Sequence, residues 1–389
     1  MPVAAGAGRN HARPPRPTGG PWLGLFFLAV FAFVAIAQRP WSGSGWRGLL
    51  PTPAPATPVW TRAVGPRSLV TADGDGIALL TTNAGDASIV RLAPDGTLRQ
   101  QGAAQGAALV VGTGARPVLL RTDPPAIGRL QAGGVTWIPI DVGATPATAI
   151  SAFGRRETLL VLAGPPGGTS PAGNLLCLTP DGRKRWEVDV TEGVVTAVDA
   201  GSQGGFAVAT FIPGAQPHAS VAFLTPDGAF KGRFDLGPDP VFRMYLDSHE
   251  DAILALDATQ AWLIETKSGS TRSIAVEGPL AGGFALSGEV HVATEKGLVL
   301  SIGRDGQTNW QRQLAGAPVD LVEIPSGGLL VLVEDRLYAL DAGGRGRWTL
   351  ALTDAPKQVV VPAAGGQVVV LTASKLAGYP LPSAGKTGP

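Results

Sequence analysis

The sequence predicts an all-β fold, an eight-bladed β-propeller with four antiparallel strands in each blade. A short phrase recurs along the chain, in which an apolar strand runs into a glycine turn and a second strand follows, usually with an aromatic residue. The turn glycines are 37 to 48 residues apart, and a period near 40 is typical of propeller blades. Glycine and proline are abundant, with 54 and 34 of 389 residues, and only 16% of residues are charged. This composition suits many short strands joined by turns.

The clearest copy of the phrase is residues 175–186, LLCLTPDGRKRW. Asp181-Gly182 between apolar runs favours a hairpin, because the turn needs backbone with positive φ and glycine supplies it without steric cost. The turn glycines of the seven copies are, in chain order, Gly96, Gly134, Gly182, Gly228, Gly269, Gly306 and Gly344. One copy alone would prove little, but seven in register predict the fold.

The two ends of the repeat region predict an eighth, split blade. Residues 58–64 resemble the strand that ends a repeat, but no strand precedes them. Residues 375–381 resemble the strand before a turn, but no aromatic strand follows. We therefore expect the N-terminal strand to pair into the last blade, so that the ring over residues 57–382 leaves only short protected edges. Residues 383–389 should form a flexible tail.

The phrase at residues 337–348, LYALDAGGRGRW, resembles the repeat of the pyrroloquinoline-quinone-like propellers, the superfamily of quinoprotein alcohol dehydrogenases and BamB-type envelope assembly factors. The resemblance covers roughly residues 57–382 and implies the fold, whereas function depends on sites grafted onto a fold. In that family the repeat Trp and Gly dock neighbouring blades. The resemblance carries this role to Trp60, Trp137, Trp186, Phe234, Trp310 and Trp348, with Gly182, Gly228, Gly306 and Gly344. The copies around Gly96 and Gly269 lack the aromatic residue, so their blades should dock more loosely.

An apolar segment precedes the propeller and predicts export. Residues 1–20 are a basic polar tail, and residues 21–37 carry no charge. As an anchor this run is near the short limit for spanning a bilayer. As a signal peptide it ends in Ala35-Ile36-Ala37, a typical cleavage site. Residues 38–56 are a Pro/Gly-rich linker, expected to be an extended spacer.

Both interpretations place the propeller outside the cytoplasm. The basic tail should stay inside, which makes the chain a single-pass protein of the cytoplasmic membrane with its propeller in the periplasm or at the cell exterior. If the signal is cleaved after Ala37, the propeller is secreted.

No catalytic residue, metal ligand or cofactor is predicted from the motifs. Asp73-Gly74-Asp75-Gly76 offers two carboxylates. Because Ca²⁺ is usually coordinated by six to eight oxygens, a hairpin turn is the favoured interpretation of this run. The histidines 218, 249 and 291 lack ligand spacing, and the lone Cys177 lies in an apolar strand, as a buried residue would. The net charge of +1 gives no nucleic-acid footprint.

The resemblance implies an alternative, a quinoprotein-like oxidoreductase or a sugar-binding or sugar-processing propeller enzyme. Family enzymes hold Ca²⁺ through carboxylate and amide oxygens and stack a Trp under the quinone. The asparagines of this chain do not sit beside paired acids in such a motif. We therefore expect a non-catalytic scaffold for protein–protein interaction.

The two longest repeats place their extra residues at the same point, between the second and third strands of consecutive blades. Because strands alternate in direction, both loops should emerge on one face, and insertions in repeats tend to map to the binding face. Tolerated loop growth is the alternative, since long surface insertions cost little. The residues proposed for partner binding are Pro165, Pro166, Thr169, Pro213, Gln216 and His218.

Overall fold

The computed structural model describes residues 54–381, which belong to one compact unit, residues 46–389. The gaps in this description are residues 56, 84–85, 113–116, 123, 133, 141–148, 155–157, 164–172, 180, 191–192, 202, 248, 285–288, 325–326 and 364–365. The basic tail, the apolar run and residues 38–53 of the linker lie outside the described residues. No helix occurs among the described residues, so none of them forms a helix that could cross a membrane.

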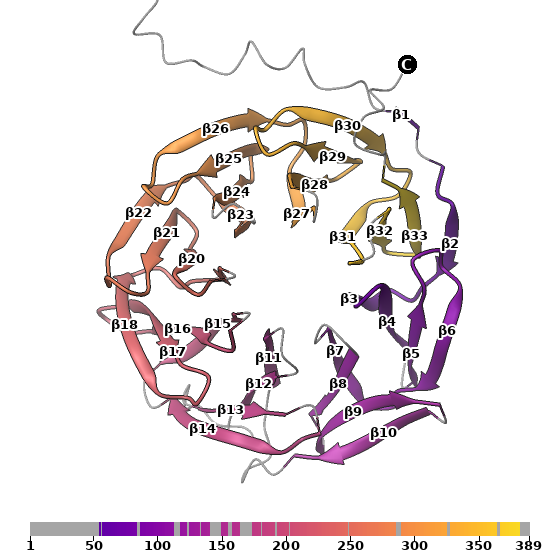
Figure 1. Ribbon diagram of the computed structural model, residues 1–389, viewed down its shortest axis with the longest axis horizontal. Coiled ribbons are helices and arrows are strands. Elements are labelled where there is room, and N and C mark those ends of the chain that lie inside the picture. Colours follow the sequence, from indigo (N-terminus) through magenta and orange to yellow (C-terminus); the bar gives the residue numbers. More distant parts are fainter. Residues whose placement is uncertain are drawn as a thin grey trace, which may run out of the picture. The chain divides into compact units, whose positions relative to one another are not determined.

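Eight antiparallel sheets follow one another around a ring, as an eight-bladed propeller requires (Figure 1). Blade 1 contains β3 (Arg67–Asp73), β4 (Gly76–Asn83), β5 (Asp86–Leu92) and β6 (Leu98–Ala103). Blade 2 contains β7 (Ala107–Gly112), β8 (Pro117–Thr122), β9 (Pro125–Gln131) and β10 (Gly134–Pro139). Blade 3 contains β11 (Ala149–Gly154), β12 (Thr158–Ala163), β13 (Gly173–Leu178) and β14 (Lys184–Val190). Blade 4 contains β15 (Val194–Ala200), β16 (Phe206–Ile212), β17 (His218–Leu224) and β18 (Phe230–Gly237).

The second half of the ring repeats this arrangement. Blade 5 contains β19 (Arg243–Leu246), β20 (Ala252–Leu256), β21 (Gln260–Glu265) and β22 (Thr271–Ala275). Blade 6 contains β23 (Pro279–Phe284), β24 (Val290–Thr294), β25 (Leu298–Ile302) and β26 (Thr308–Gln313). Blade 7 contains β27 (Pro318–Glu323), β28 (Leu329–Val333), β29 (Arg336–Leu340) and β30 (Gly346–Ala351). Blade 8 contains β31 (Pro356–Val360), β32 (Gln367–Thr372), β33 (Lys375–Pro380) and β2 (Trp60–Ala63).

Each blade runs from an inner first strand to an outer fourth strand (Figure 1). Because the strands alternate in direction, the turns after the first and third strands share one face, which we call the turn face. The connections after the second and fourth strands share the other face, which we call the loop face. The second and third strands are the most buried: every residue of β20, β24 and β28 is buried. The apolar core therefore lies between neighbouring blades.

The predicted closure is confirmed. β2 pairs antiparallel with β33, with Trp60 opposite Gly378 and Thr61 opposite Ala377. The first strand of the propeller thus supplies the outer strand of the last blade. This pairing joins the two ends of the chain's repeat region into one sheet, which removes the edge that an open ring would expose.

A further strand lies outside the predicted boundary of the propeller. β1 (Ala54–Pro55) comes from the predicted linker and pairs parallel with β30, the outer strand of blade 7. The prediction treated all of residues 38–56 as a spacer, because such a proline-rich run is expected to be extended and semi-rigid. The two residues of β1 need only a strand edge to pair with, and blade 7 provides one.

At three junctions between blades, an indole of one blade packs on the turn glycine of the next. The indole N–H of Trp186 donates to the carbonyl of Pro226 at 2.9 Å, and a Cβ on Gly228 would lie 2.6 Å from the Trp186 ring. Only glycine therefore leaves room, and it also supplies the φ of 86° that the turn needs. The same contact joins Trp60 to Pro94 and Gly96, and Trp310 to Ala342 and Gly344.

The other residues predicted to dock neighbouring blades make different contacts. Phe234 packs between blades 4 and 5 and approaches Gly269, and Trp348 packs between blades 7 and 8 without a turn glycine beneath it. Trp137 differs in direction: it packs into the core between blades 1 and 2, and Ile138 is the residue that contacts Gly182 of the next blade. Trp137 stands three residues after its turn glycine, whereas Trp186 stands four after its own, so the side chain points to the opposite side of the strand.

The blades without an aromatic residue use other contacts. A Cβ on Gly306 would meet the guanidinium of Arg272, which thus takes the place of an indole between blades 5 and 6. Between blades 1 and 2, a Cβ on Gly102 would lie 3.1 Å from the Cα of Gly134, so the two backbones approach directly. Looser docking of these blades stays a prediction.

One titratable group lies deep in the junction of blades 6 and 7. His291 on β24 is 2% exposed, and its ring centroid lies 5.5 Å from that of Trp310. Its Nε2 is 3.7 Å from the Glu289 carboxylate, too long for a hydrogen bond. Burial lowers the pKa of His291 to about 4, with Glu289 opposing the shift. The histidine is therefore neutral in the fold.

We expect Trp186→Ala to destabilise the propeller by about 3 kcal/mol, the usual cost of truncating a large packed aromatic side chain. The reason is the loss of the contact with Gly228 together with that with Phe206, whose ring centroid is 5.5 Å away. Chemical denaturation monitored by circular dichroism measures the change. Arg183→Ala, an exposed substitution on the same turn, is the control, and a Trp186 variant as stable as this control would refute the docking role.

We expect stability to fall as the pH is lowered from about 6.5 to about 4, because His291 binds a proton in the unfolded chain but not in the fold. The loss should approach about 3 kcal/mol below the folded pKa. The measurement is the denaturation midpoint of wild type and of His291→Phe at several pH values across this range. The difference in stability between the two proteins should become smaller or change sign at acid pH. A difference that is constant with pH would show that His291 does not titrate in this way.

Candidate functional site

The sequence singled out two insertions, and the one that the structure describes, residues 213–217, lies on the loop face. Residues 164–172 connect β12 to β13, the second and third strands of blade 3, so the predicted position is confirmed. Pro165, Pro166 and Thr169 themselves lie outside the described residues. Residues 213–217 make the matching connection in blade 4 and are exposed, with Pro213 and Gln216 among them.

The third predicted residue of this loop is already engaged. His218 opens β17, and its Nε2 lies 3.0 Å from Oδ1 of Asp235 on the neighbouring strand β18. The contact holds the end of the loop against the outer strand. The exposed part of the loop available to a partner is therefore residues 213–217.

Two apolar side chains are exposed on the same face, at the start of neighbouring inner strands. Val194 is the first residue of β15, pairs with Phe211 next to the inserted loop, and is 39% exposed. Phe242 immediately precedes β19, where its N–H donates to the carbonyl of Leu256, and is 43% exposed. We call Val194, Phe242 and residues 213–217 the loop-face patch. Sequence reasoning missed Val194 and Phe242, because each looks like any other apolar strand residue.

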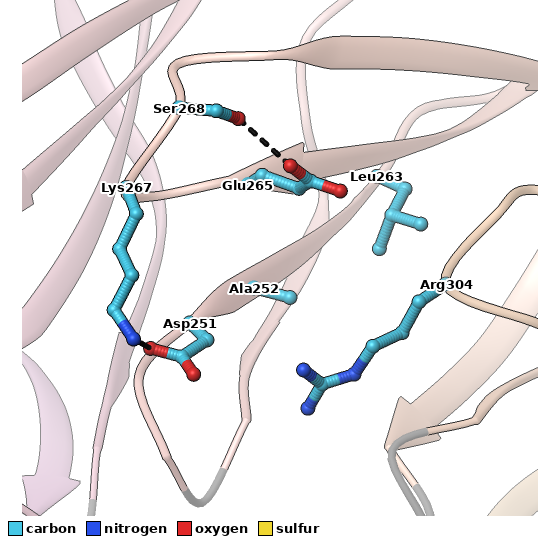
Figure 2. A pocket seen from close by; sticks show the side chains of 7 residues that line it. All are labelled: Asp251, Ala252, Leu263, Glu265, Lys267, Ser268 and Arg304. Atoms are coloured by element: carbon cyan, nitrogen blue, oxygen red, sulfur yellow. Dashed lines mark hydrogen bonds and ion pairs between the residues drawn. The ribbon is translucent and has the colours of Figure 1, made fainter.

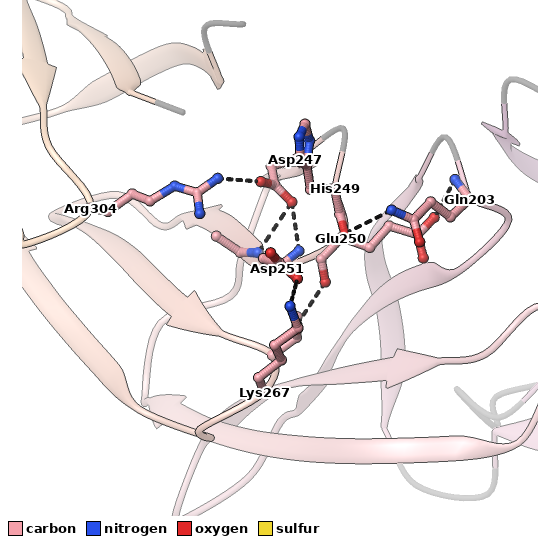
Figure 3. A network of polar contacts seen from close by, with 9 residues as sticks. Gln203, Asp247, His249, Glu250, Asp251, Lys267 and Arg304 are labelled. Atoms are coloured by element: carbon pink, nitrogen blue, oxygen red, sulfur yellow. Dashed lines mark hydrogen bonds and ion pairs between the residues drawn. The ribbon is translucent and has the colours of Figure 1, made fainter. Parts of the chain in front are cut away.

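The turn face carries a polar network that joins three blades (Figure 3). Asp247, in the turn between β19 and β20, is 3% exposed and accepts hydrogen bonds from the N–H groups of Asp251 and Ala252. Its second oxygen lies 2.9 Å from Nη2 of Arg304, which comes from the turn of blade 6. A buried carboxylate needs such donors to offset its lost hydration. The network therefore fixes the Arg304 guanidinium against blade 5.

Glu250 extends the network to blade 4. Its carboxylate accepts hydrogen bonds from the N–H groups of Gln203 at 2.7 Å and Gly205 at 3.0 Å. A Cβ on Gly201 or Gly205 would overlap this carboxylate, so glycine at both positions leaves the space for it. Glu250 has a φ of 58°, uncommon for a residue with a side chain. The contacts with blade 4 and the hydrogen bond from Thr266 to its carbonyl hold this conformation.

A small cavity of about 240 Å³ opens beside this network (Figure 2). Leu263 and Ala252 form its apolar part, and Arg304 points toward it from the adjacent blade. The charged side chains around it are largely paired: Lys267 lies 2.8 Å from Asp251, and Glu265 accepts a hydrogen bond from Ser268. The Lys267 ammonium lowers the pKa of Asp251. The cavity thus combines an apolar part with charged and hydroxyl groups around it.

Sequence reasoning missed this network. Its partners Gln203 and Arg304 are 47 residues before Glu250 and 57 residues after Asp247 along the chain. They meet only because the same turns recur at one face of the ring. The one local signal was a cluster of acidic residues in a turn without an Asp-Gly pair.

The other residues considered for chemistry have structural roles. Asp73 and Asp75 lie at the hairpin between β3 and β4, as predicted, and form ion pairs with Arg91 and Arg99. Burial raises the pKa of Asp73, which is partly offset by Arg91. Cys177 is buried, and burial raises its thiol pKa to about 12. Among the described side chains, no group of three or more His, Cys, Asp or Glu residues could hold a metal ion.

Comparisons with known proteins show the fold. No family model matches the chain and no curated protein matches its sequence, so membership of the pyrroloquinoline-quinone-like family stays a prediction. Among solved structures, Sqt1 of Saccharomyces cerevisiae has a TM-score of 0.63 at 9% identity, covering 85% of this chain and 100% of that one. BamB of Moraxella catarrhalis has a TM-score of 0.53 at 12% identity, covering 84% and 100%. BBS1N, solved in complex with ARL6DN, has a TM-score of 0.52 at 12% identity, covering 86% and 99%. The chain is thus similar to several β-propellers.

Proposed function

We propose that this protein is a non-catalytic, exported scaffold that binds a protein partner through the loop face of its propeller. The observation that carries the proposal is the loop-face patch, where two exposed apolar side chains on neighbouring blades accompany an exposed inserted loop. Binding surfaces of repeat proteins commonly collect their insertions on one face.

The chemistry of the patch suits a protein partner. Phe242 offers a large apolar surface on a backbone fixed by a strand hydrogen bond, so little conformational freedom is lost when it is covered. Aromatic residues that fill partner pockets dominate the energy of many interfaces, and polar neighbours exclude water around them. The connection at residues 213–217 adds a loop that begins and ends with proline, which stiffens it.

The similar structures support an interaction role as analogy only. BBS1N, one of these neighbours, was crystallised in complex with another protein, ARL6DN. The similarity in each case is that of the fold, and one fold hosts many functions.

We expect a double substitution, Val194→Ser with Phe242→Ser, to reduce capture of the partner at least about tenfold, since loss of a central aromatic anchor costs on the order of 2 kcal/mol. The measurement is affinity purification of the full chain from its own cells after mild crosslinking, with partners quantified by mass spectrometry. Phe230→Ser is the matched control, because Phe230 is 64% exposed on the turn-face side of β18. If the control loses the same protein and the double variant retains it, the loop face is not the binding face.

Export is the second part of the proposal, supported by the apolar run at residues 21–37 and the basic tail before it. A reporter that is active only outside the cytoplasm, fused after Pro382, should be active, and a reporter active only in the cytoplasm should be silent. The reverse pattern would overturn the export proposal. N-terminal sequencing of the mature protein then distinguishes a retained anchor from cleavage after Ala37.

A further inference from the structure

The linker contributes a strand to the propeller at one specific edge. β1 lies parallel to β30, with Ala54 opposite Leu350 and Pro55 opposite Ala351. β30 is the outermost strand of blade 7, so β1 makes this sheet the five-stranded one among those described (Figure 1). The outer edge of a blade otherwise presents unpaired N–H and C=O groups to solvent.

The hydrogen-bonding groups of this edge can be assigned from their neighbours. The N–H of Leu352 donates to the carbonyl of Asp335, toward the inside of the blade. Backbone groups alternate in direction along a strand, so the N–H of Ala351 points outward to β1. Pro55 has no N–H, so Ala54 must supply the donor of the short strand, and its carbonyl can accept from Ala351.

The sequence before β2 has a pattern that suits a strand pairing on one side only. Prolines stand at positions 51, 53 and 55, at every second residue. Proline is tolerated in an edge strand where its missing N–H would face solvent. With Ala54 facing β30, Pro55 faces outward. Such a strand covers an edge and cannot itself recruit another strand on its outer side.

We propose that Ala54–Pro55, at the end of the linker, is a clasp whose docking site is the outer edge of blade 7. The linker segment that begins the propeller is thus part of its structure rather than a free spacer. β30 runs from the turn face to the loop face, and the parallel β1 runs the same way. Within the clasp, Ala54 therefore lies nearer the turn face than Pro55, and the clasp is on blade 7, whereas the loop-face patch is on blades 4 and 5. The proposal does not depend on what binds that patch.

Amide hydrogen exchange of the full chain tests the clasp. The reference is Gln313 on β26, because Leu314 donates to Gly297 just as Leu352 donates to Asp335, and no added strand pairs with β26 among the described residues. In the wild type the Ala351 amide should exchange at least about tenfold more slowly than Gln313, after correction for intrinsic rates. Ala54→Pro removes the N–H through which β1 donates to β30. In this variant the Ala351 amide should exchange as fast as the Gln313 amide. Pro55→Ala, which changes only the outward position, should keep Ala351 protected.

The outcomes separate the clasp from a general effect on stability. In both variants the melting temperature of the propeller should change by no more than is expected for a substitution on an edge strand. The exchange rate of the Gln313 amide should be the same in both variants as in the wild type. Equal exchange of Ala351 and Gln313 in the wild type would overturn the proposal. So would unchanged protection in Ala54→Pro, or loss of protection in Pro55→Ala.

Discussion

The contact on which the ring depends is the docking of an outer-strand side chain onto the turn of the next blade. At three junctions an indole lies on a turn glycine and donates its N–H to the carbonyl two residues before that glycine. The contact is possible only because glycine lacks a Cβ and tolerates positive φ. One residue type thus satisfies the turn and the junction together, and each blade fixes the next.

Where the indole is absent, other contacts join the blades. Arg272 takes its place against Gly306, and the Asp247–Glu250 network links blades 4, 5 and 6 on the turn face. A polar junction depends on complete hydrogen bonding, since an unpaired buried carboxylate is costly. The contacts between neighbouring blades can therefore differ in chemistry from one junction to another, as long as the turn geometry is retained. Because these contacts do not involve the loop face, the connections on that face can vary in length, as the two insertions do.

The two faces of the ring consequently differ in character. The turn face is fixed by hairpin turns and by the polar network, and its cavity is small and lined by paired charges. The loop face carries the long connections and the exposed Val194 and Phe242. The clasp lies on the outer edge of blade 7, away from the loop-face patch on blades 4 and 5. A partner surface on the loop face is consistent with all three features.

The sequence by itself determined the repeat, the number of blades and the split closing blade, since turn glycines and apolar strands are local signals that recur with a fixed period. Tertiary structure decided which side chain occupies each junction. Trp137 packs backward because it stands one residue nearer its turn, and one residue reverses the side of a strand to which it points. Only the ring brings Gln203, Glu250, Asp247 and Arg304 together, and only the free edge of blade 7 turns Ala54–Pro55 into a strand. These contacts join residues far apart in the chain, so no local pattern encodes them.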